Sequence, residues 1–339
     1  MNNEPLGVLN KPKDGVAYIV VSWNNQTIIG DCLKSIQLQD YKNKKKVLVI
    51  DNSSSDKTLE YLKDSFPEVE VLAQSENLGF AKGNNLGIVK ALEDPDIEYV
   101  VLLNTDARLD KNWTTTLVES SKLRPLTATM QSITLDYYDP SIIDSTHIYI
   151  SRNGQGTQGS WRQPIATKAD VPPQKVFGCN AAAMLITRKF IEAQPFKNFL
   201  DQTMFMYLED VDVAARASVM GWDNFVIPGT RAYHMGSVSS AKKDPSFSIY
   251  MTFRNNTGLL IKNLPAAILV RILVSLPKAD RAAIKHLKRI GKPQAIPALI
   301  KGRVVSIGFI PIFLWKRHQL KNYRKVNKYY LWQLMRRGY

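Results

Sequence analysis

Apolar runs in the first third of the chain end on polar residues. The runs cover 17–22 (AYIVVS), 47–50 (VLVI) and 99–103 (YVVLL), and they are followed by Trp23-Asn24-Asn25, Asp51 and Asn104-Thr105-Asp106. Unbroken runs of this length, rich in β-branched residues, predict strands buried on both faces, as in a parallel sheet. Because ligands of open α/β sheets bind at the carboxyl ends of the strands, we expect these polar residues to form a site.

Helix-like segments separate the strand-like runs through about residue 120. Residues 27–39 and 59–66 place apolar residues at helical spacing, and another helix is predicted to end near residue 92. The resulting order, β-α-β-α-β-α-β, predicts a Rossmann-like α/β fold, with a mostly parallel central sheet and helices on both faces.

The pattern is less regular beyond residue 124. Residues 124–175 show no clear period, and within them Ser151–Ser160 (SRNGQGTQGS) is rich in Gly and polar residues. We interpret this stretch as a mobile loop and a candidate lid. A buried strand is expected at 181–186 and a helix at 206–220.

The positive charge of the chain is concentrated at its end. The net charge is +15, yet residues 262–339 hold 18 Lys and Arg against one acid, and the preceding residues hold 27 basic and 29 acidic side chains. A nucleic-acid-binding domain would carry a basic excess of its own, so this distribution argues against that class.

The basic C-terminal region alternates apolar and charged stretches. Its apolar stretches, 266–276 and 304–315, are shorter than the roughly 20 residues that span a bilayer, and Arg271 and Pro311 interrupt them. Helices of this composition are expected to lie on an anionic membrane surface. A solvated basic face and an RNA-binding tail remain the alternatives.

The N-terminus and the cysteines bear on the compartment. The first 15 residues are polar, so we expect no signal peptide there. The two cysteines, Cys32 and Cys179, lie far apart and show no metal or redox spacing, which favours a reducing compartment without disulfides.

Two of the strand ends carry candidate ligand-binding chemistry. Asp51 can accept hydrogen bonds from a nucleotide base or ribose, or it can cap the helix that follows. Asn104 and Asp106 lie two residues apart after a buried strand, and oxygens of this kind hold hard divalent cations. A Mg²⁺ or Mn²⁺ site is therefore expected beside Asp106.

A second acidic group lies at Glu209-Asp210-Val211-Asp212. Three carboxylates in four residues are costly unless some face water, a cation or Arg. On a helix Asp212 pairs with Arg216 at i,i+4, which leaves Asp210 free to act as a general base. His234 is either an ordinary surface or core residue or a third ligand of a Mn²⁺-type site.

Taken in order, these segments resemble a known enzyme family. The segments are VVSWNN, VIDNSSSDKT, NLGFAKGNN, LLNTDA, FGCNAAAMLITRK, MFMYLEDVDVAAR, HMGSVS and YMTFRNN. The chain resembles a family 2 inverting glycosyltransferase with the GT-A fold, of the bacterial rhamnosyltransferase-like branch. The resemblance covers about residues 16–262.

The resemblance implies roles for individual residues. Asp106 and His234 would be metal ligands, and Asp210 the catalytic base. Asp51 would contact the nucleotide base. Other residues of the donor side would be Ser22, Asn24, Asn77, Lys82, Asn84, Asn85, Asn104 and Thr105. The acceptor side would include Gly178, Cys179, Asn180, Glu209 and Arg254, with Cys179 standing where Ala and other small residues are frequent in the family.

The resemblance and the charge distribution together predict a domain plan. Residues 1–15 would be an N-terminal extension, 16–262 the glycosyltransferase domain, and 263–339 a basic amphipathic helical region that associates with a membrane. Within the glycosyltransferase domain, 16–123 would bind the nucleotide and 124–262 the acceptor. The enzyme would then work in the cytoplasm, peripherally on the inner face of the cell membrane.

The implied reaction is a single displacement that inverts the anomeric centre. Rhamnose from dTDP-rhamnose is the preferred donor sugar, followed by galactofuranose or another hexose from a UDP donor. The acceptor would be a glycan or a polyprenyl-linked glycan in cell-surface polysaccharide synthesis. The oligomeric state stays open, a homo-oligomer included.

A nucleotidyltransferase is the rival enzyme class, since it also combines an α/β sheet, acidic residues and Mg²⁺. It would usually carry a Gly-rich loop with a basic residue after the first strand. The residues at that position are Trp23-Asn24-Asn25-Gln26, with neither Gly nor Lys, which argues against it.

Overall fold

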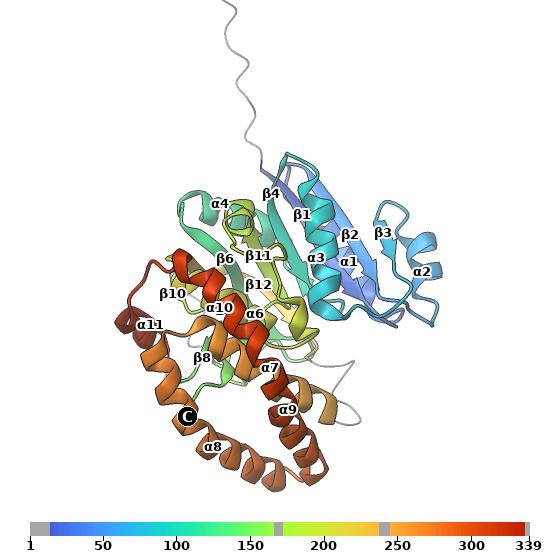
Figure 1. Cartoon of the computed structure of the whole chain (residues 1–339). Helices are drawn as coiled ribbons and strands as arrows, with labels where there is room; N and C mark the ends of the chain where they lie inside the picture. Colours follow the sequence, from blue (N-terminus) through green and yellow to red (C-terminus); the bar gives the residue numbers. More distant parts are fainter. Residues whose placement is uncertain (1–13, 166–171, 237–244, 336–339) are drawn as a thin grey trace, which may run out of the picture.

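One mixed sheet runs through the protein (Figure 1). The computed structural model describes residues 14–165, 172–236 and 245–335. Its sheet contains β1 (Gly15–Ser22), β2 (Lys45–Asp51), β3 (Glu70–Ala73), β4 (Ile97–Leu103), β5 (Ala107–Leu109), β6 (Thr127–Asp136), β7 (Ile143–Ser145), β10 (Gln174–Val176), β11 (Ala183–Thr187) and β12 (Asp223–His234). A separate hairpin is formed by β8 (Ile148–Ile150) and β9 (Gly156–Gln158).

Helices cover both faces of the sheet and extend beyond it. The α-helices are α1 (Ile29–Gln37), α2 (Thr58–Ser65), α3 (Gly79–Leu92), α4 (Trp113–Lys122), α5 (Arg188–Glu192), α6 (Glu209–Val219), α7 (Ser246–Asn263), α8 (Ala266–Arg289), α9 (Ile296–Gly308), α10 (Ile310–Leu320) and α11 (Lys328–Leu334). Short 3₁₀ turns lie at η2 (Gln202–Met204), η3 (Pro293–Ala295) and η4 (Lys321–Tyr323).

The strand order confirms the expected α/β fold. Along the sheet the order is β10-β12-β6-β11-β4-β1-β2-β3. Strands β3, β2, β1 and β4 are parallel neighbours, and β12 is parallel to β6. Strand β11 runs antiparallel to both of its neighbours, β4 and β6. The central sheet is therefore mostly parallel, with one reversed strand at its middle.

The alternation of side chains along β1 shows why helices are needed on both faces. Val16, Tyr18 and Val20 belong to the core that includes α1 and α4, whereas Ala17 and Ile19 belong to the core that includes α3. All five side chains are fully buried. Successive strand residues point to opposite faces, so a strand that is apolar throughout must be covered twice.

Residues 124–175, for which the sequence predicted no regular element, contain the long strand β6. Its polar side chains are buried and hydrogen-bonded: Thr129 donates to Asn224 and Trp113 donates to Ser132. Because their hydrogen bonds are made inside the protein, polar side chains can line a buried strand, and such a strand does not appear as an apolar run in the sequence. Part of Ser151–Ser160, interpreted as a mobile loop, forms instead the hairpin strand β9, and Asn256 of α7 donates a hydrogen bond to the Gly154 carbonyl.

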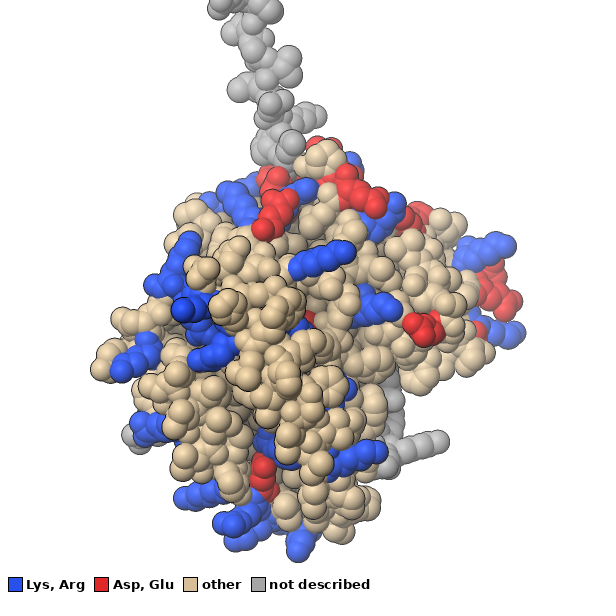
Figure 2. All heavy atoms as spheres, in the orientation of Figure 1, with Lys and Arg blue, Asp and Glu red and all other residues tan. Residues whose placement is uncertain are grey.

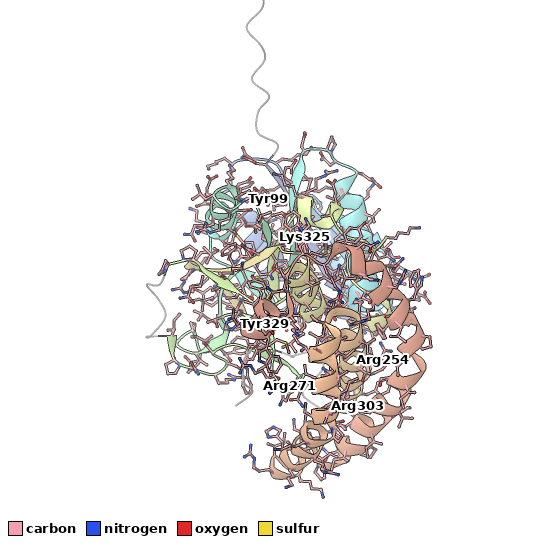
Figure 3. The ribbon with its side chains drawn as sticks, turned by 60° about the vertical axis from the view of Figure 1, so that its left-hand side comes forward. Tyr99, Arg254, Arg271, Arg303, Lys325 and Tyr329 are labelled. Atoms are coloured by element: carbon pink, nitrogen blue, oxygen red, sulfur yellow. The ribbon has the colours of Figure 1, made fainter. Side chains whose placement is uncertain are left out.

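The C-terminal helices pack back onto the protein. Side chains of α6, α7, α8, α10 and α11 share a second apolar core with the strand β8. Gly258 of α7 lies so close to α10 that a Cβ atom there would stand 2.1 Å from the Phe313 ring. In Figure 3, Arg254 and Arg303 lie within this helical layer. Lys and Arg gather over its lower end, around α8 and α9 (Figure 2).

The described helices are short relative to a bilayer or too polar to cross it singly. Among the described residues, no single helix has the length and apolar character needed to cross a membrane. The stretches 293–308 and 310–323 meet that requirement only as a pair, and they are bent by 61° relative to each other.

Candidate active site

The ends of β1 and β2 place two predicted donor-side residues next to each other. Ser22 and Asp51 are partners in the parallel register of these strands, and both are fully buried. Ser54 donates to both Asp51 oxygens, from its backbone N–H at 3.0 Å and from its hydroxyl at 2.5 Å. The Ser22 hydroxyl has no hydrogen-bond partner among the described residues.

Asn24 organises the neighbouring turn. Its backbone is in the left-handed region, with φ 55°. Its side-chain oxygen accepts hydrogen bonds from the N–H groups of Ser55, at 2.7 Å, and Asp56, at 3.3 Å. The side-chain oxygen of Asn24 thus holds the loop after β2 rather than standing free.

The motif at the start of α3 is used mainly to fix the helix. Asn77 accepts a hydrogen bond from the Gly79 N–H, and Asn84 donates to the Phe80 carbonyl. The Asn85 amide exchanges two hydrogen bonds of 2.8 Å with the backbone of Leu200. Lys82 is half exposed and lies 3.8 Å from Glu76. Of these four side chains Lys82 is the one that carries a charge, and its ammonium group stays accessible to solvent.

The segment after β4 brings the candidate metal ligands together. Asp106 and Thr105 are buried, and the Asp106 carbonyl accepts a hydrogen bond from the Met235 N–H. The end of β12 pairs with β5, which places His234 Nε2 3.3 Å from Asp106 Oδ1. His234 Nδ1 lies 3.0 Å from Asp144 Oδ2. An imidazole between two carboxylates is the result.

This arrangement fits a divalent cation. Histidines that bind a metal usually donate a hydrogen bond from their second ring nitrogen to a carboxylate, and this bond fixes the orientation and the tautomer of the ring. Asp144 stands in that position, and Asp106 Oδ1 and His234 Nε2 face each other, an oxygen and a nitrogen of the kinds that bind divalent ions. Among the described residues, no group of three His, Cys, Asp or Glu side chains surrounds one point. Asp106 and His234 would therefore supply two ligands, and substrate and water the others.

The charge of His234 follows from the same contacts. Burial opposes protonation of the ring, but the hydrogen bonds with Asp106 and Asp144 outweigh it and raise the pKa of His234 to about 10. Without a cation, the imidazole itself supplies the positive charge between the two carboxylates.

Asp210 lies at the same edge of the sheet as Asp106. Asp210 is in the first turn of α6, and its carboxylate accepts hydrogen bonds from the N–H groups of Val211, at 2.7 Å, and Ala181, at 3.4 Å. The Ala182 carbonyl in turn accepts from the Asn104 N–H at 3.0 Å. One short stretch of backbone therefore connects the candidate base to the candidate metal segment.

Burial changes the acidity of both carboxyls at the start of α6. It raises the pKa of Asp210 to about 6, against the opposing effect of the Val211 and Ala181 N–H groups. Burial, and then the charge of Asp210, raise the pKa of Glu209 to about 8. One Glu209 oxygen has no hydrogen-bond partner among the described residues. At neutral pH Asp210 is ionised and can accept a proton, whereas Glu209 holds one.

The acceptor-side segment before β11 is tightly packed. The carbonyl of Gly178 accepts a hydrogen bond from the Ile148 N–H, and a Cβ atom on Gly178 would stand 2.1 Å from that of Ala214. The thiol of Cys179 is buried against the Phe225 carbonyl, and burial raises its pKa to about 12. Asn180 caps its own loop by accepting from the Ala182 N–H. These three residues position the backbone that binds Asp210.

A strained loop leads into Asp210. Three residues before α6, Phe205, Tyr207 and Leu208, have φ of 60–71°, which costs of order 1–3 kcal/mol at each L-residue. Two side chains of α7 hold this loop. Arg254 donates to the carbonyls of Thr203 and Met204, and the Asn255 amide donates to those of Met204, Met206 and Tyr207 at 2.8–2.9 Å.

Two positioning residues were missed by the sequence reasoning. Asp144 lies in the segment without a clear period, and nothing in its neighbours pointed to His234. Asn255 follows Arg254 in the segment YMTFRNN, one of those that carry the resemblance. An amide in a helix gives no hint, however, that it binds a loop about 50 residues earlier in the chain.

Proteins similar to this chain include several glycosyltransferases. The model of the family Glycosyl transferase family 2 matches residues 18–193. The chain is 22% identical over 247 residues to the low-salt glycan biosynthesis hexosyltransferase Agl10 of Haloferax volcanii, covering 71% of this chain and 74% of that protein. It is 24% identical over 216 residues to the N-acetylglucosaminyl-diphospho-decaprenol L-rhamnosyltransferase of Mycobacterium tuberculosis, covering 59% of this chain and 69% of that protein.

A solved structure supports the fold. The mannosyltransferase PcManGT from Pyrobaculum calidifontis, in complex with GDP-Man and Mn²⁺, matches with a TM-score of 0.52 and 17% identity, over 94% of this chain and 89% of that chain.

Proposed function

The chain belongs to glycosyl transferase family 2, and from that premise we propose that it transfers a hexose, with inversion, from a nucleotide-sugar to a hydroxyl of a glycan or lipid-linked glycan. One observation carries the proposal. Asp210 and the Asn104–Asp106 segment meet at one edge of the sheet, joined through Ala181 and Ala182. A base and a site for the leaving group are what a single displacement requires.

Asp210 is the proposed general base. Its carboxylate is ionised at neutral pH, and its two N–H donors fix its direction. The acceptor hydroxyl would attack the anomeric carbon while Asp210 Oδ accepts its proton, so the new C–O bond forms as the bond to the diphosphate breaks. No covalent intermediate with the protein is involved.

Asp106 and His234 are the proposed ligands of a Mg²⁺ or Mn²⁺ ion. Such an ion, when bound, neutralises the charge that develops on a departing nucleoside diphosphate. Asp144 holds the imidazole in place through Nδ1. Ser22 and Asp51 lie at the ends of the neighbouring strands, where the nucleoside would bind.

Rhamnose from dTDP-rhamnose is the proposed donor sugar. Its support is the similarity to a protein named as an L-rhamnosyltransferase that acts on a diphospho-decaprenol-linked sugar. A UDP-galactofuranose or other UDP-hexose donor is the alternative. We further propose a peripheral location on the inner face of the cell membrane, supported by the concentration of Lys and Arg in residues 262–339.

A donor screen with the full-length protein tests this function. We expect Mg²⁺- or Mn²⁺-dependent release of nucleoside diphosphate, fastest with dTDP-rhamnose, and a product of inverted anomeric configuration. Asp210→Asn should lower transfer by roughly 10²–10⁴-fold while donor affinity stays within about twofold. Asp64→Asn, at an exposed acid of α2, is the matched control and should retain activity.

Two further measurements complete the test. Asp106→Ala should weaken donor binding in the presence of metal and leave metal-free binding unchanged. Release of inorganic diphosphate from a nucleoside triphosphate in the presence of a sugar 1-phosphate, with no nucleoside diphosphate released from any nucleotide-sugar, would identify a nucleotidyltransferase and refute the proposal. Full transfer by the Asp210→Asn variant would refute the role of Asp210.

A further inference from the structure

A basic cavity lies among the C-terminal helices, away from the candidate active site. Its volume is about 520 Å³, and it opens between the end of α6, the start of α8 and the segment from α10 to α11. Val219 lines it at the end of α6, about 14 Å along the helix axis from Asp210. Five of its lining side chains are basic: Arg317, His318, Lys321, Arg324 and Lys328.

Two of these cations are fixed by the main chain. Arg317 donates from Nη1 to the carbonyls of Ile261 and Leu264, at 2.6 and 2.5 Å. Arg324 donates to the carbonyls of Asn263 and Lys262, at 2.9 and 3.1 Å. Both therefore cap the C-terminus of α7, where a positive charge is favourable. This role accounts for the placement of two guanidinium groups but not for the other three basic side chains.

The cavity lacks a counter-charge. Among the described residues, no Asp or Glu lines it. Burial, and then the charge of the neighbouring Arg317, lower the pKa of Arg324 to about 10. Arg317 and Arg324 are half-buried, whereas His318, Lys321 and Lys328 are exposed. Like charges that lie close together repel one another, and a bound anion would offset this repulsion.

Two other cations of the same helical layer have acidic partners. Lys262 contacts Asp201 and Asp212, at 2.5 and 2.8 Å, and Arg303 makes a two-pronged contact with Asp280. Arg254 of α7 donates instead to main-chain carbonyls and to the Asn255 amide oxygen. The basic cavity differs in gathering several basic side chains, and an anion from outside the protein would offset their charge.

We propose that this cavity binds the phosphate group of a lipid headgroup at an anionic membrane surface. Guanidinium groups suit phosphate because they offer paired donors in fixed geometry. The rim indicates a lipid source, since Leu314 lines the cavity and Trp315, Tyr323 and Tyr329 stand exposed on the same segment. Aromatic side chains of this kind favour the membrane interface. Figure 3 labels Lys325 and Tyr329, which bracket the lining residues Val326 and Lys328.

The test compares two double variants of equal charge in the full-length protein. Lys321→Ala with Lys328→Ala removes two cations from the cavity without touching the arginines that cap α7. Lys285→Ala with Lys288→Ala removes two exposed cations of α8, outside the cavity. Co-sedimentation is measured with vesicles of phosphatidylcholine alone and of phosphatidylcholine with phosphatidylglycerol. Thermal unfolding of each variant checks that it is folded.

The proposal expects binding to the vesicles that contain phosphatidylglycerol. It also expects the cavity variant to bind them at least about tenfold more weakly than the α8 variant. Equal loss in the two variants would overturn it, because a diffuse basic surface depends only on total charge. Failure of the wild-type protein to bind either vesicle would also overturn it.

Competition with soluble inorganic diphosphate distinguishes a lipid headgroup from a free phosphate compound as the ligand of the cavity. If it displaces the protein from vesicles, and the cavity variant no longer responds, the cavity binds phosphate and the lipid headgroup is its source. If diphosphate binds the wild-type protein in titration calorimetry but vesicles do not, a free phosphate compound is the ligand and the lipid source is wrong. These readouts require no donor sugar, so they are independent of the proposed transfer reaction.

Discussion

At the scale of single residues, Asp210 and Glu209 are neighbours in sequence with different tasks. Both are buried at the start of α6, but Asp210 has two N–H donors that favour its charged form, and one Glu209 oxygen has no partner among the described residues. The environment therefore gives two similar carboxyl groups different proton affinities, which is the basis for proposing Asp210 as the base.

The ionisation of Asp210 should appear in the pH profile. Because burial raises its pKa to about 6, the carboxyl becomes protonated as the pH falls through that value, and it can no longer accept a proton. We expect kcat/KM to fall about tenfold per pH unit below about pH 6. Circular dichroism at each pH distinguishes this loss from unfolding. A profile that stays flat down to about pH 5 would contradict the assignment.

Glu209 should make the free energy of unfolding fall as the pH rises, whereas the expected activity falls as the pH is lowered. Its pKa is about 8 in the folded protein, against 4.5 for an ordinary glutamate, so the folded state binds the proton more tightly. The stability contributed by this group is present below about pH 4.5 and is lost as the pH rises through about 8.

Glu209→Gln removes this dependence. We expect it to raise the free energy of unfolding at about pH 8 by on the order of 1 kcal/mol or more, and to change it little at about pH 5. Urea unfolding measures both values, with the exposed Glu60→Gln as control. A gain that is the same at both pH values would count against a proton held by Glu209.

At the scale of elements, the loop before α6 and the helix α7 act together. The loop contains three L-residues in the left-handed region, and the Phe205 carbonyl accepts a hydrogen bond from Ala81 of α3. Gly79, with φ 74°, allows that approach, since a Cβ atom there would stand 2.5 Å from the Phe205 ring. The donor-side helix and the base-carrying helix thus meet at this loop.

Asn255 should therefore affect catalysis from a distance. Asn255→Ala removes the amide that binds three loop carbonyls, so the strained loop can relax and Asp210 loses its position. We expect kcat to fall roughly tenfold to hundredfold, with little change in donor affinity. Asn256→Ala is the matched control, because Asn256 is equally buried but binds Gly154. An equal loss of kcat in both variants would show a general effect of stability instead.

The same elements show how far sequence alone could go. The ends of β1, β2 and β4 were predicted because long apolar runs stop there on polar residues, and the structure confirms those strands. The strand β6 was not predicted, because its polar side chains are buried and satisfied by partners such as Asn224, far along the chain. Likewise the hydrogen bonds from Asn255 to the loop before α6 are accepted by main-chain carbonyls. Every residue has a carbonyl, so no sequence pattern reveals which ones are bound.

At the scale of the whole molecule, the C-terminal helices are part of the folded core. Lys262 at the end of α7 is buried between Asp201 and Asp212, and Lys316 of α10 also contacts Asp201. Burial would favour the neutral acid, but Lys262 and Lys316 hold the pKa of Asp201 well below its usual range. Removing everything after residue 263 would take Lys316 and part of the second core away, so point substitutions are the better test of membrane binding.

Lys262→Met tests this coupling. The change leaves two buried carboxylates with one cation fewer, and we expect the free energy of unfolding to fall by roughly 3–5 kcal/mol. Urea unfolding followed by circular dichroism provides the measurement. Lys285→Met, at an exposed lysine of α8, should change stability by no more than about 0.5 kcal/mol. If Lys262→Met lowered the free energy of unfolding no more than Lys285→Met does, the contacts of Lys262 with Asp201 and Asp212 would contribute little to stability.

The reversed strand β11 has a consequence for how this protein could diversify. Because β11 runs against β4, its first residues meet the last residues of β4, and the main chain of residues 181–182 links the Asn104 N–H to the Asp210 carboxylate. If Asp210 is the base, as proposed, its distance from the leaving group is set by the pairing of these strands. Sugar preference would then be free to change through side chains that leave this pairing intact.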